Sequence, residues 1–190
     1  MGWETDMEIS TDDLDRILAA AAFAADRHRM QRRKDAEASP YINHPLALAH
    51  ILSREGKISD ADILCAALLH DTVEDTETTL EELERRFGAE VASIVAEVTN
   101  DETLPKAEQK RLQVANAASK SRGAKLVKLA DKISNLRDIA ATPPADWSAE
   151  RRAEYYRWSL EVVAGLRGVS PALEQAFDQA YESGLARIGD

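Results

Sequence analysis

The chain has few of the residues that interrupt helices. Its 190 residues include 8 glycines and 6 prolines, and aromatic residues make up 5% of the sequence. Ala and Leu are abundant instead, and both favour helix formation. The sequence shows no strand-like alternation of useful length, no internal repeat and no glycine-rich phosphate loop. We therefore expect an all-α protein.

Cysteine is almost absent. Cys65 stands alone, which excludes an internal disulfide and any zinc site built from several thiolates. It lies within an apolar run, so a small core residue is its expected role. The hydrophobic share of 44% is ordinary for a globular protein.

Long apolar runs and an excess of positive charge are also missing. No apolar segment approaches the ~18 residues that a membrane span requires, and the acidic N-terminus lacks the pattern of a signal peptide. We therefore expect a cytoplasmic protein without membrane contact. The net charge of −10 disfavours nucleic acid as a partner, so cations that cluster locally are informative.

The length suits a single domain. We expect residues 1–10 to form a leader and residues 11–190 to form the domain. Ser10 or Thr11 can cap a first helix, which we expect to run to about Arg33.

The most informative stretch is residues 63–75. Its first seven residues are all apolar, which predicts a helix buried in the core. Four ionisable residues then follow within roughly one and a half helical turns: His70, Asp71, Glu74 and Asp75. Carboxylates beside a buried helix repel one another and lose hydration, and a divalent cation is the simplest way to hold them. A polar helix end that emerges into solvent is the alternative interpretation.

Two further segments can add ligands. His44 precedes Pro45, which fits the first turn of a helix; it is either packed or a fixed ligand on the N-terminal side of that helix. Asp131 follows apolar residues on a predicted helix over residues 125–139, with Asn135 on the same face. Read alone, Asp131 is a helix-surface carboxylate paired with Lys128 or Lys132.

Together, His44, His70, Asp71 and Asp131 make a mixed nitrogen and oxygen set that suits Mn²⁺, Fe²⁺ or Zn²⁺. Water bound to such an ion becomes a nucleophile near neutral pH. Glu74 and Asp75 would then handle its protons.

Cations gather at the predicted end of the first helix. They complement the helix dipole or bind phosphate, and they include Arg27, Arg29, Arg32, Arg33 and Lys34. Tyr155 is a core candidate that could also stack on a base.

Four segments, in this order, resemble the HD superfamily of metal-dependent phosphohydrolases. Within it, the chain is similar to the small alarmone hydrolases, the stand-alone hydrolase branch of the RelA/SpoT homologues that includes a metazoan SpoT-like form. The segments are residues 32–35, 41–45, 66–75 and 125–137. The resemblance covers nearly the whole chain and implies one compact helical bundle of roughly eight to ten helices.

The resemblance also implies roles for particular residues. It makes His44, His70, Asp71 and Asp131 metal ligands and makes Glu74 and Asp75 the catalytic pair. It places four residues at the substrate: Arg33, Lys34, Asn135 and, more weakly, Tyr155. The family often has His or Tyr where this chain has Ser134, a departure expected to leave the metal site untouched and to alter pocket shape.

Three functions follow as hypotheses. The first is a Mn²⁺-dependent guanosine 3′,5′-bis(diphosphate) 3′-pyrophosphohydrolase that converts (p)ppGpp to GDP or GTP and pyrophosphate. The second keeps the site but removes the 2′-phosphate of NADPH. The third, of a different class, is a nucleotide-binding regulatory module without catalysis. The expected partner is a small nucleotide, and association into homo-oligomers stays open.

Overall fold

The computed structural model describes residues 9–35 and 37–189. Over these residues the chain forms ten α-helices, two short helical segments and no β-strand, which confirms the all-α prediction. Most of the predicted leader lies outside the described residues. The elements are α1 (Thr11–Arg27), α2 (Asn43–His50), η1 (Ile51–Glu55), α3 (Ala61–Leu69), α4 (Thr72–Asp75), α5 (Leu80–Phe87), α6 (Ala89–Val98), α7 (Lys106–Asn116), η2 (Ala117–Ser119), α8 (Arg122–Ala141), α9 (Ala149–Leu166) and α10 (Pro171–Gly189).

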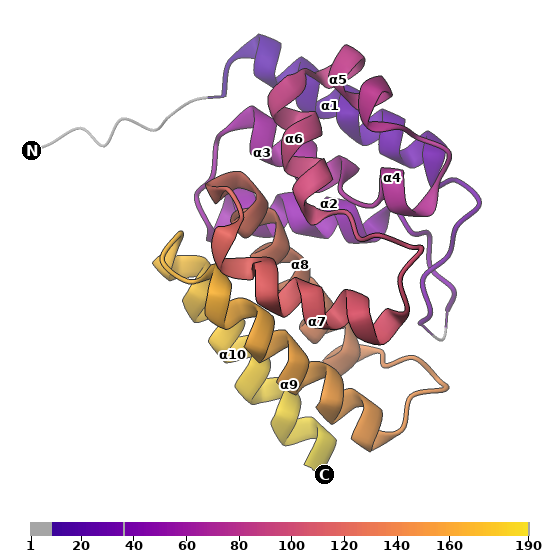
Figure 1. Ribbon diagram of the computed structural model, residues 1–190, viewed down its shortest axis with the longest axis vertical. Helices are drawn as coiled ribbons and strands as arrows, with labels where there is room; N and C mark the ends of the chain where they lie inside the picture. Colours follow the sequence, from indigo (N-terminus) through magenta and orange to yellow (C-terminus); the bar gives the residue numbers. More distant parts are fainter. Residues whose placement is uncertain (1–8, 36, 190) are drawn as a thin grey trace, which may run out of the picture.

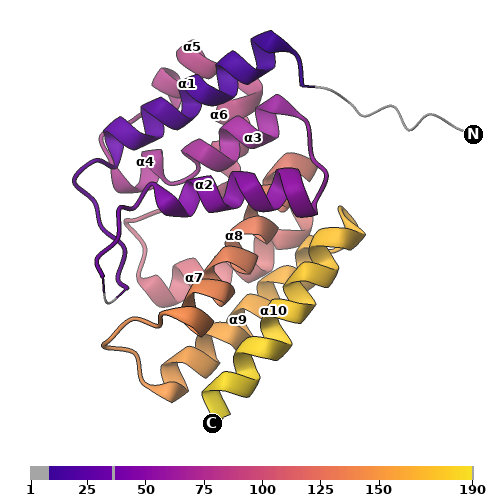
Figure 2. The same cartoon turned by 180° about the vertical axis from the view of Figure 1, so that it is seen from behind.

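The helices form two groups that meet at α8. Helices α1 to α6 make the upper group in Figure 1, and α7, α9 and α10 lie below it. Seen from behind in Figure 2, α2 crosses between the α1–α3 pair and α8. Helix α3 packs against α1, α2, α6 and α8, and α8 packs in turn against α2, α6, α9 and α10. The site residues therefore lie on or beside the two most central helices.

Helix α3 forms where the apolar run predicts a buried helix. Asp60 caps its N-terminus by accepting hydrogen bonds from the backbone N–H groups of Asp62 and Ile63. Every residue from Ile63 to Leu69 is buried, and Cys65 is fully so, which confirms its place in the core. A helix that is apolar on all sides needs neighbours on all sides, and the surrounding helices supply them.

The first helix ends earlier than its cations predict. Its last residue is Arg27, and the prediction of a helix to about Arg33 is wrong. The chain turns after His28, whose carbonyl accepts the N–H of Gln31, and an isolated β-bridge then joins Arg32 to Pro40. Arg32, Arg33 and Lys34 therefore lie on a loop and do not cap a helix.

The helical stretch expected over residues 63–75 is interrupted. Residues 70 and 71 form a turn between α3 and α4, so the expected single helix through Asp75 is wrong. At the break, the Thr72 hydroxyl donates to the carbonyl of Leu69 at 2.7 Å. A side-chain hydroxyl that bonds a helix carbonyl competes with the helical backbone ladder. His70 and Asp71 consequently sit at a junction, and Glu74 and Asp75 sit on the separate α4.

Pro45 lies in the first turn of α2, as its fixed φ angle predicts. His44 is the second residue of that helix, so it belongs to the helix and does not precede it. Among the described residues, no helix is both long and apolar enough to cross a membrane.

Candidate metal centre and catalytic pair

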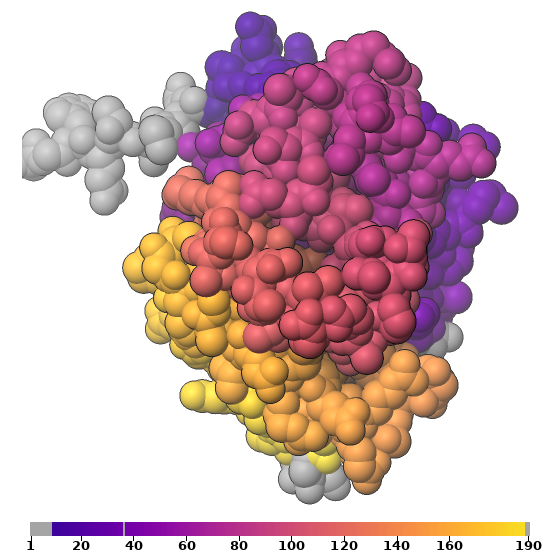
Figure 3. All heavy atoms as spheres, viewed as in Figure 1, coloured from indigo at the N-terminus to yellow at the C-terminus, as the bar shows by residue number. Residues whose placement is uncertain are grey.

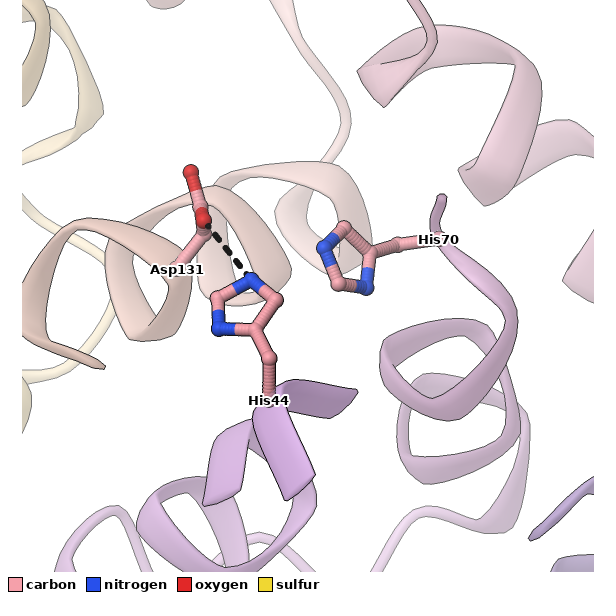
Figure 4. Close-up of side chains that lie close together, drawn as sticks. All are labelled: His44, His70 and Asp131. Atoms are coloured by element: carbon pink, nitrogen blue, oxygen red, sulfur yellow. Dashed lines mark ion pairs between the residues drawn. The ribbon is translucent and has the colours of Figure 1, made fainter. Parts of the chain in front are cut away.

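Three buried side chains from three separate elements converge between α3 and α8. They are His44 on α2, His70 after α3 and Asp131 on α8 (Figure 4). One ligand atom from each lies within 4.8 Å of the other two. Nε2 of His44 is 3.4 Å from Oδ1 of Asp131, and the two imidazole rings are 5.3 Å apart. Nitrogen and oxygen donors at this spacing can share one ion.

The orientation of His70 is set by the helix that precedes it. Its Nδ1 lies 2.8 Å from the carbonyl oxygen of Ala67, which can only accept, so Nδ1 carries the proton. Nε2 then presents its lone pair toward His44. This buried atom lies 2.9 Å from Oδ2 of Asp71 and has no assigned hydrogen bond within the described part of the chain. A fixed tautomer with a bare buried nitrogen is the arrangement that a metal ligand requires.

Asp71 stands beside both histidines. Its Oδ2 is 2.9 Å from Nε2 of His70 and 3.9 Å from Nε2 of His44, and its side chain is 21% exposed. The hydroxyl of Tyr41 donates to the same oxygen. Burial opposes charge on both partners, but their mutual attraction outweighs it, so the pKa of Asp71 is lowered and the pKa of His70 is raised.

Asp131 is more buried than its sequence context predicts. It is 7% exposed, yet Lys132, its predicted partner, does lie 3.3 Å from its Oδ2. Its Oδ1 faces His44 and also accepts a 2.6 Å hydrogen bond from Asn135. Burial alone would raise the pKa of Asp131, but Lys132 and His44 hold that pKa well below its usual range.

Ser134 stands where the family often has His or Tyr, a departure expected to leave the metal site untouched and to alter pocket shape. Its hydroxyl lies 3.4 Å from Nδ1 of His44, and Ser134 is not among the residues that line the cavity described below. Ser134 therefore contacts a candidate metal ligand.

The donor set fits a divalent cation. Two imidazoles and two carboxylates meet, and at least one nitrogen is buried without a partner. The charge of Asp131 is offset by Lys132, His44 and Lys128, and the charge of Asp71 is offset by His70 and His44. The set contains no sulfur and therefore does not by itself select one metal.

Glu74 and Asp75 occupy α4, next to this cluster, and their surroundings differ. Glu74 is half-buried and accepts three hydrogen bonds from Asn100. Asp75 is exposed and accepts a 2.8 Å hydrogen bond from Gln31. Both carboxylates are thus held by amide donors.

A cavity of about 550 Å³ opens beside the cluster. Its wall contains His44 and Asp75, together with all four residues that the resemblance places at the substrate: Arg33, Lys34, Asn135 and Tyr155. Glu74 is not among the lining residues. Arg33 is held in the wall by Asp138 at 2.5 Å. The cavity is therefore lined by cations, by aromatic rings and by the exposed carboxylate of Asp75.

Several residues of the site escaped the sequence argument. They are Gln31, Tyr41, Asn100, Lys132 as a buried cation, Asp138 and Trp147. Tyr41 and Lys132 lie within segments that carry the family resemblance, residues 41–45 and 125–137. Gln31, Asn100 and Asp138 are ordinary helix or loop residues, and their partners Asp75, Glu74 and Arg33 lie far away in the chain.

The fold and the donor set agree with the comparison to known families. The family model of the HD domain matches residues 20–168. The chain therefore belongs to the HD domain family.

Three relatives show how far the likeness extends. The guanosine-3′,5′-bis(diphosphate) 3′-pyrophosphohydrolase MESH1 of Xenopus tropicalis is 57% identical over 90% of this chain and 96% of that protein. The human MESH1 is 56% identical over 87% of this chain and 93% of that protein. The bifunctional (p)ppGpp synthase/hydrolase SpoT of Escherichia coli is 35% identical over 90% of this chain but 25% of its own length. This chain thus matches one part of the longer bifunctional protein.

A solved structure supports the fold. It is described as a metazoan ortholog of SpoT that hydrolyzes ppGpp and plays a role in starvation responses. It shares 47% identity with a TM-score of 0.86, over 90% of this chain and 96% of that one. The helical HD-type bundle expected from the sequence is therefore confirmed.

Proposed function

We propose that this protein is a metal-dependent guanosine 3′,5′-bis(diphosphate) 3′-pyrophosphohydrolase. The observation that carries the proposal is the cluster of His44, His70 and Asp131 beside a cavity that holds Asp75 and several cations. The substrate class comes from relatives named for this activity that align over nearly their full length.

We propose His44, His70, Asp71 and Asp131 as the residues that would hold the ion. Mn²⁺ is the metal we propose, and Zn²⁺ or Fe²⁺ would suit the same donors. When bound, such an ion supplies positive charge to a phosphate and lowers the pKa of water.

The chain itself supplies the proton chemistry. Glu74 and Asp75 orient the attacking water and remove its proton as it attacks the phosphorus linked to the 3′ oxygen. The bond between that phosphorus and the 3′ oxygen breaks, and the oxygen leaves with a proton from the same pair. Pyrophosphate and GDP or GTP result, and one water is consumed.

Basic residues of the cavity wall offset the charge of the substrate. Arg33 and Lys34 would contact phosphates, since guanidinium and ammonium groups make charge-assisted hydrogen bonds with them. Asn135 and Tyr155 would contact the nucleoside part. An acidic protein must provide such positive charge locally, and the loop after α1 does so.

Product analysis tests the proposal directly. Metal-stripped protein is incubated with ppGpp, with and without added Mn²⁺, and the products are separated by ion exchange. We expect GDP and pyrophosphate only when the metal is present. Phosphate released from NADPH, with ppGpp intact, would reassign the substrate to a 2′-phosphate. Tight nucleotide binding without turnover would instead favour a regulatory module.

A double variant tests the catalytic pair. Glu74→Gln with Asp75→Asn keeps the shape of both side chains and removes their ability to take protons. We expect metal content to stay at the wild-type level while turnover falls by at least 10³-fold, since the variant lacks its general base. Undiminished turnover would show that other residues carry the proton.

The cytoplasmic location, the single-domain boundaries and any homo-oligomer stay predictions.

A further inference from the structure

Glu74 is held by one residue that no sequence signal marks. The backbone N–H of Asn100 donates to Oε2 of Glu74 at 3.0 Å, and Nδ2 of the same residue reaches Oε2 at 2.9 Å and Oε1 at 3.2 Å. Asn100 lies in the connection from α6 to α7, which passes beside α4 in Figure 1. One residue thus contacts both oxygens of the carboxylate.

A second amide fixes the direction of the first. Nε2 of Gln113, on α7, donates to Oδ1 of Asn100 at 2.9 Å. An asparagine side chain has a donor end and an acceptor end that are nearly the same size. Because Gln113 donates at the acceptor end and the Glu74 carboxylate can only accept, Asn100 turns its NH₂ group toward Glu74. A rotated amide would bring an oxygen against the carboxylate.

The same arrangement recurs at Asp75. Nε2 of Gln31 donates to Oδ2 of Asp75 at 2.8 Å. Nδ1 of His28 lies 2.6 Å from Oε1 of Gln31, and since an amide oxygen only accepts, His28 donates. His28 is 2% exposed, and its Nε2 has no hydrogen-bond partner among the described residues.

We propose that Asn100 and Gln31 are positioning residues for the catalytic pair, and that Gln113 and His28 fix the direction of these two amides. The proposal rests on the hydrolase function proposed above. Each carboxylate faces the NH₂ of an amide whose oxygen is held by a further donor. Neither relay contains a proposed metal ligand, although His28 packs against Tyr41, which donates to Asp71. Their task is to aim Glu74 and Asp75 at the water.

Helix α7 is linked to Glu74 through Gln113 and Asn100. Figure 3 shows the segment that carries Asn100 and Gln113, from the α6–α7 connection through α7, as the red band between the upper and lower groups of helices. A displacement of about 1 Å at a reacting group can lower a rate by roughly 10²-fold. Asn100 and Gln113 would thus influence the rate by holding Glu74, although neither lines the cavity.

The first test replaces a donor with an acceptor. Asn100→Asp retains the shape and the backbone N–H bond but turns an oxygen toward Glu74. We expect kcat for ppGpp to fall about 10- to 100-fold, while KM stays within about threefold because Asn100 does not line the cavity. Mn²⁺ affinity, measured by calorimetry, should stay unchanged. Gln31→Leu should also lower kcat.

The second test asks whether the two amides act in series. Gln113→Ala should lower kcat less than Asn100→Ala, and the double variant should match Asn100→Ala alone, because Gln113 acts only through Asn100. Gln109→Ala is the matched control. Gln109 lies one turn earlier on α7, is 5% exposed and bonds the carbonyl of Leu104 without touching Asn100 or Glu74. It should lower stability and leave kcat unchanged.

The outcomes separate this inference from the proposed function. Wild-type protein that does not hydrolyse ppGpp would overturn the function first. Active wild type with a normal kcat in Asn100→Asp would overturn the positioning role alone. Additive losses from Asn100→Ala and Gln113→Ala, or an equal loss of kcat in Gln109→Ala, would show a general structural effect of α7 and overturn the series arrangement.

Discussion

Lys132 is a buried cation next to the candidate metal centre. Its side chain is 3% exposed, with Nζ 3.3 Å from Asp131 and 4.1 Å from the centre of the Trp158 ring. The ammonium therefore lies between a carboxylate and an aromatic face, both of which stabilise positive charge. In the absence of a metal ion, Lys132 is the nearest fixed compensation for the charge of Asp131.

Replacing Lys132 with methionine should show how much the folded protein depends on Lys132 to compensate the charge of Asp131. Lys132→Met keeps the volume but leaves Asp131 buried beside the other ligands, and we expect the metal-free protein to lose ~3 kcal/mol of unfolding free energy. The loss should shrink when Mn²⁺ is present, since the ion restores positive charge. Urea unfolding with and without Mn²⁺ measures both values. Lys125→Met, on the same helix, is the control; an equal loss there would contradict the argument.

Two buried acids predict how stability changes at alkaline pH. Burial raises the pKa of Cys65 to about 11 and the pKa of Tyr156 to about 12. The folded protein holds both protons more tightly than the unfolded chain. The free energy of unfolding therefore has its full value below the ordinary pKa values, ~8.5 and ~10, and declines as pH rises through about 11 and 12.

The variant Tyr156→Phe isolates the upper part of that decline. It loses the 2.6 Å hydrogen bond to the carbonyl of Leu136, so its stability at pH 8 should be lower by about 1 kcal/mol. Between pH 10 and 12 its curve should fall less steeply than that of the wild type. Urea titrations at fixed pH give both curves, and parallel curves would argue that Tyr156 titrates as it does in the unfolded chain.

At the scale of elements, α9 and α10 approach each other through a glycine. A Cβ added to Gly184 on α10 would overlap the hydroxyl and ring of Tyr156 on α9. The Tyr156 ring is fully buried and bonded to Leu136, so it has little room to move. The absence of a side chain at this position sets the distance between the two helices.

Adding one methyl group there should push these helices apart. We expect Gly184→Ala to lower the free energy of unfolding by about 1–3 kcal/mol, despite the higher helix propensity of alanine. Thermal and urea unfolding measure the change. The neighbouring Ser183 is exposed, so Ser183→Ala should change stability by no more than ~0.5 kcal/mol. A stabilised Gly184→Ala protein would mean that the helix contact yields easily.

The scale of elements also shows where periodicity predicts a helix and where it does not. Helices α3 and α5 begin directly after their N-capping residues, Asp60 and Thr79, because an N-cap is a local interaction that short-range sequence specifies. The end of α1 and the break before α4 do not follow from local pattern. The loop after α1 is held by backbone hydrogen bonds from Arg33 to Ser39 and from Tyr41 to Gln31, and the break before α4 contains the hydroxyl of Thr72 bonded to Leu69.

At the scale of the whole molecule, the metal centre joins parts that are distant in sequence. Its four candidate ligands come from α2, the α3–α4 junction and α8, and these elements also carry much of the core. An ion bound there crosslinks both central helices. Because it binds the folded state alone, it should stabilise the entire bundle.

Melting curves test this coupling. At a Mn²⁺ concentration of about 100 times its Kd, the expected stabilisation of ~2.7 kcal/mol should raise Tm by roughly 5–10 °C, and EDTA should reverse the shift. His70→Ala removes a ligand and should abolish the rise. An equal rise in that variant would place the stabilising ion elsewhere on this acidic protein.

The chemistry of the site was readable from the sequence, but its assembly was not. His70 with Asp71 and the pair Glu74 and Asp75 form a local pattern, and Asp131 interrupts an apolar helix face. Such patterns identify residue types that suit a metal or a proton. They do not predict that His44 and Asp131, which are 87 positions apart in the chain, lie next to each other in space.

The sequence by itself determined the all-α class, the buried α3 and the set of ionisable residues, because these depend on composition, periodicity and local spacing. Only the tertiary structure decided that Asn100 and Gln31 bond Glu74 and Asp75, that Lys132 is buried beside Asp131, and that Arg32, Arg33 and Lys34 line one cavity. The contacts of Asn100 and Gln31 join residues from different elements, whereas Asp131 and Lys132 are neighbours on α8 that become buried through the packing of that helix. Their geometry is a property of the packed bundle, and no single segment specifies it.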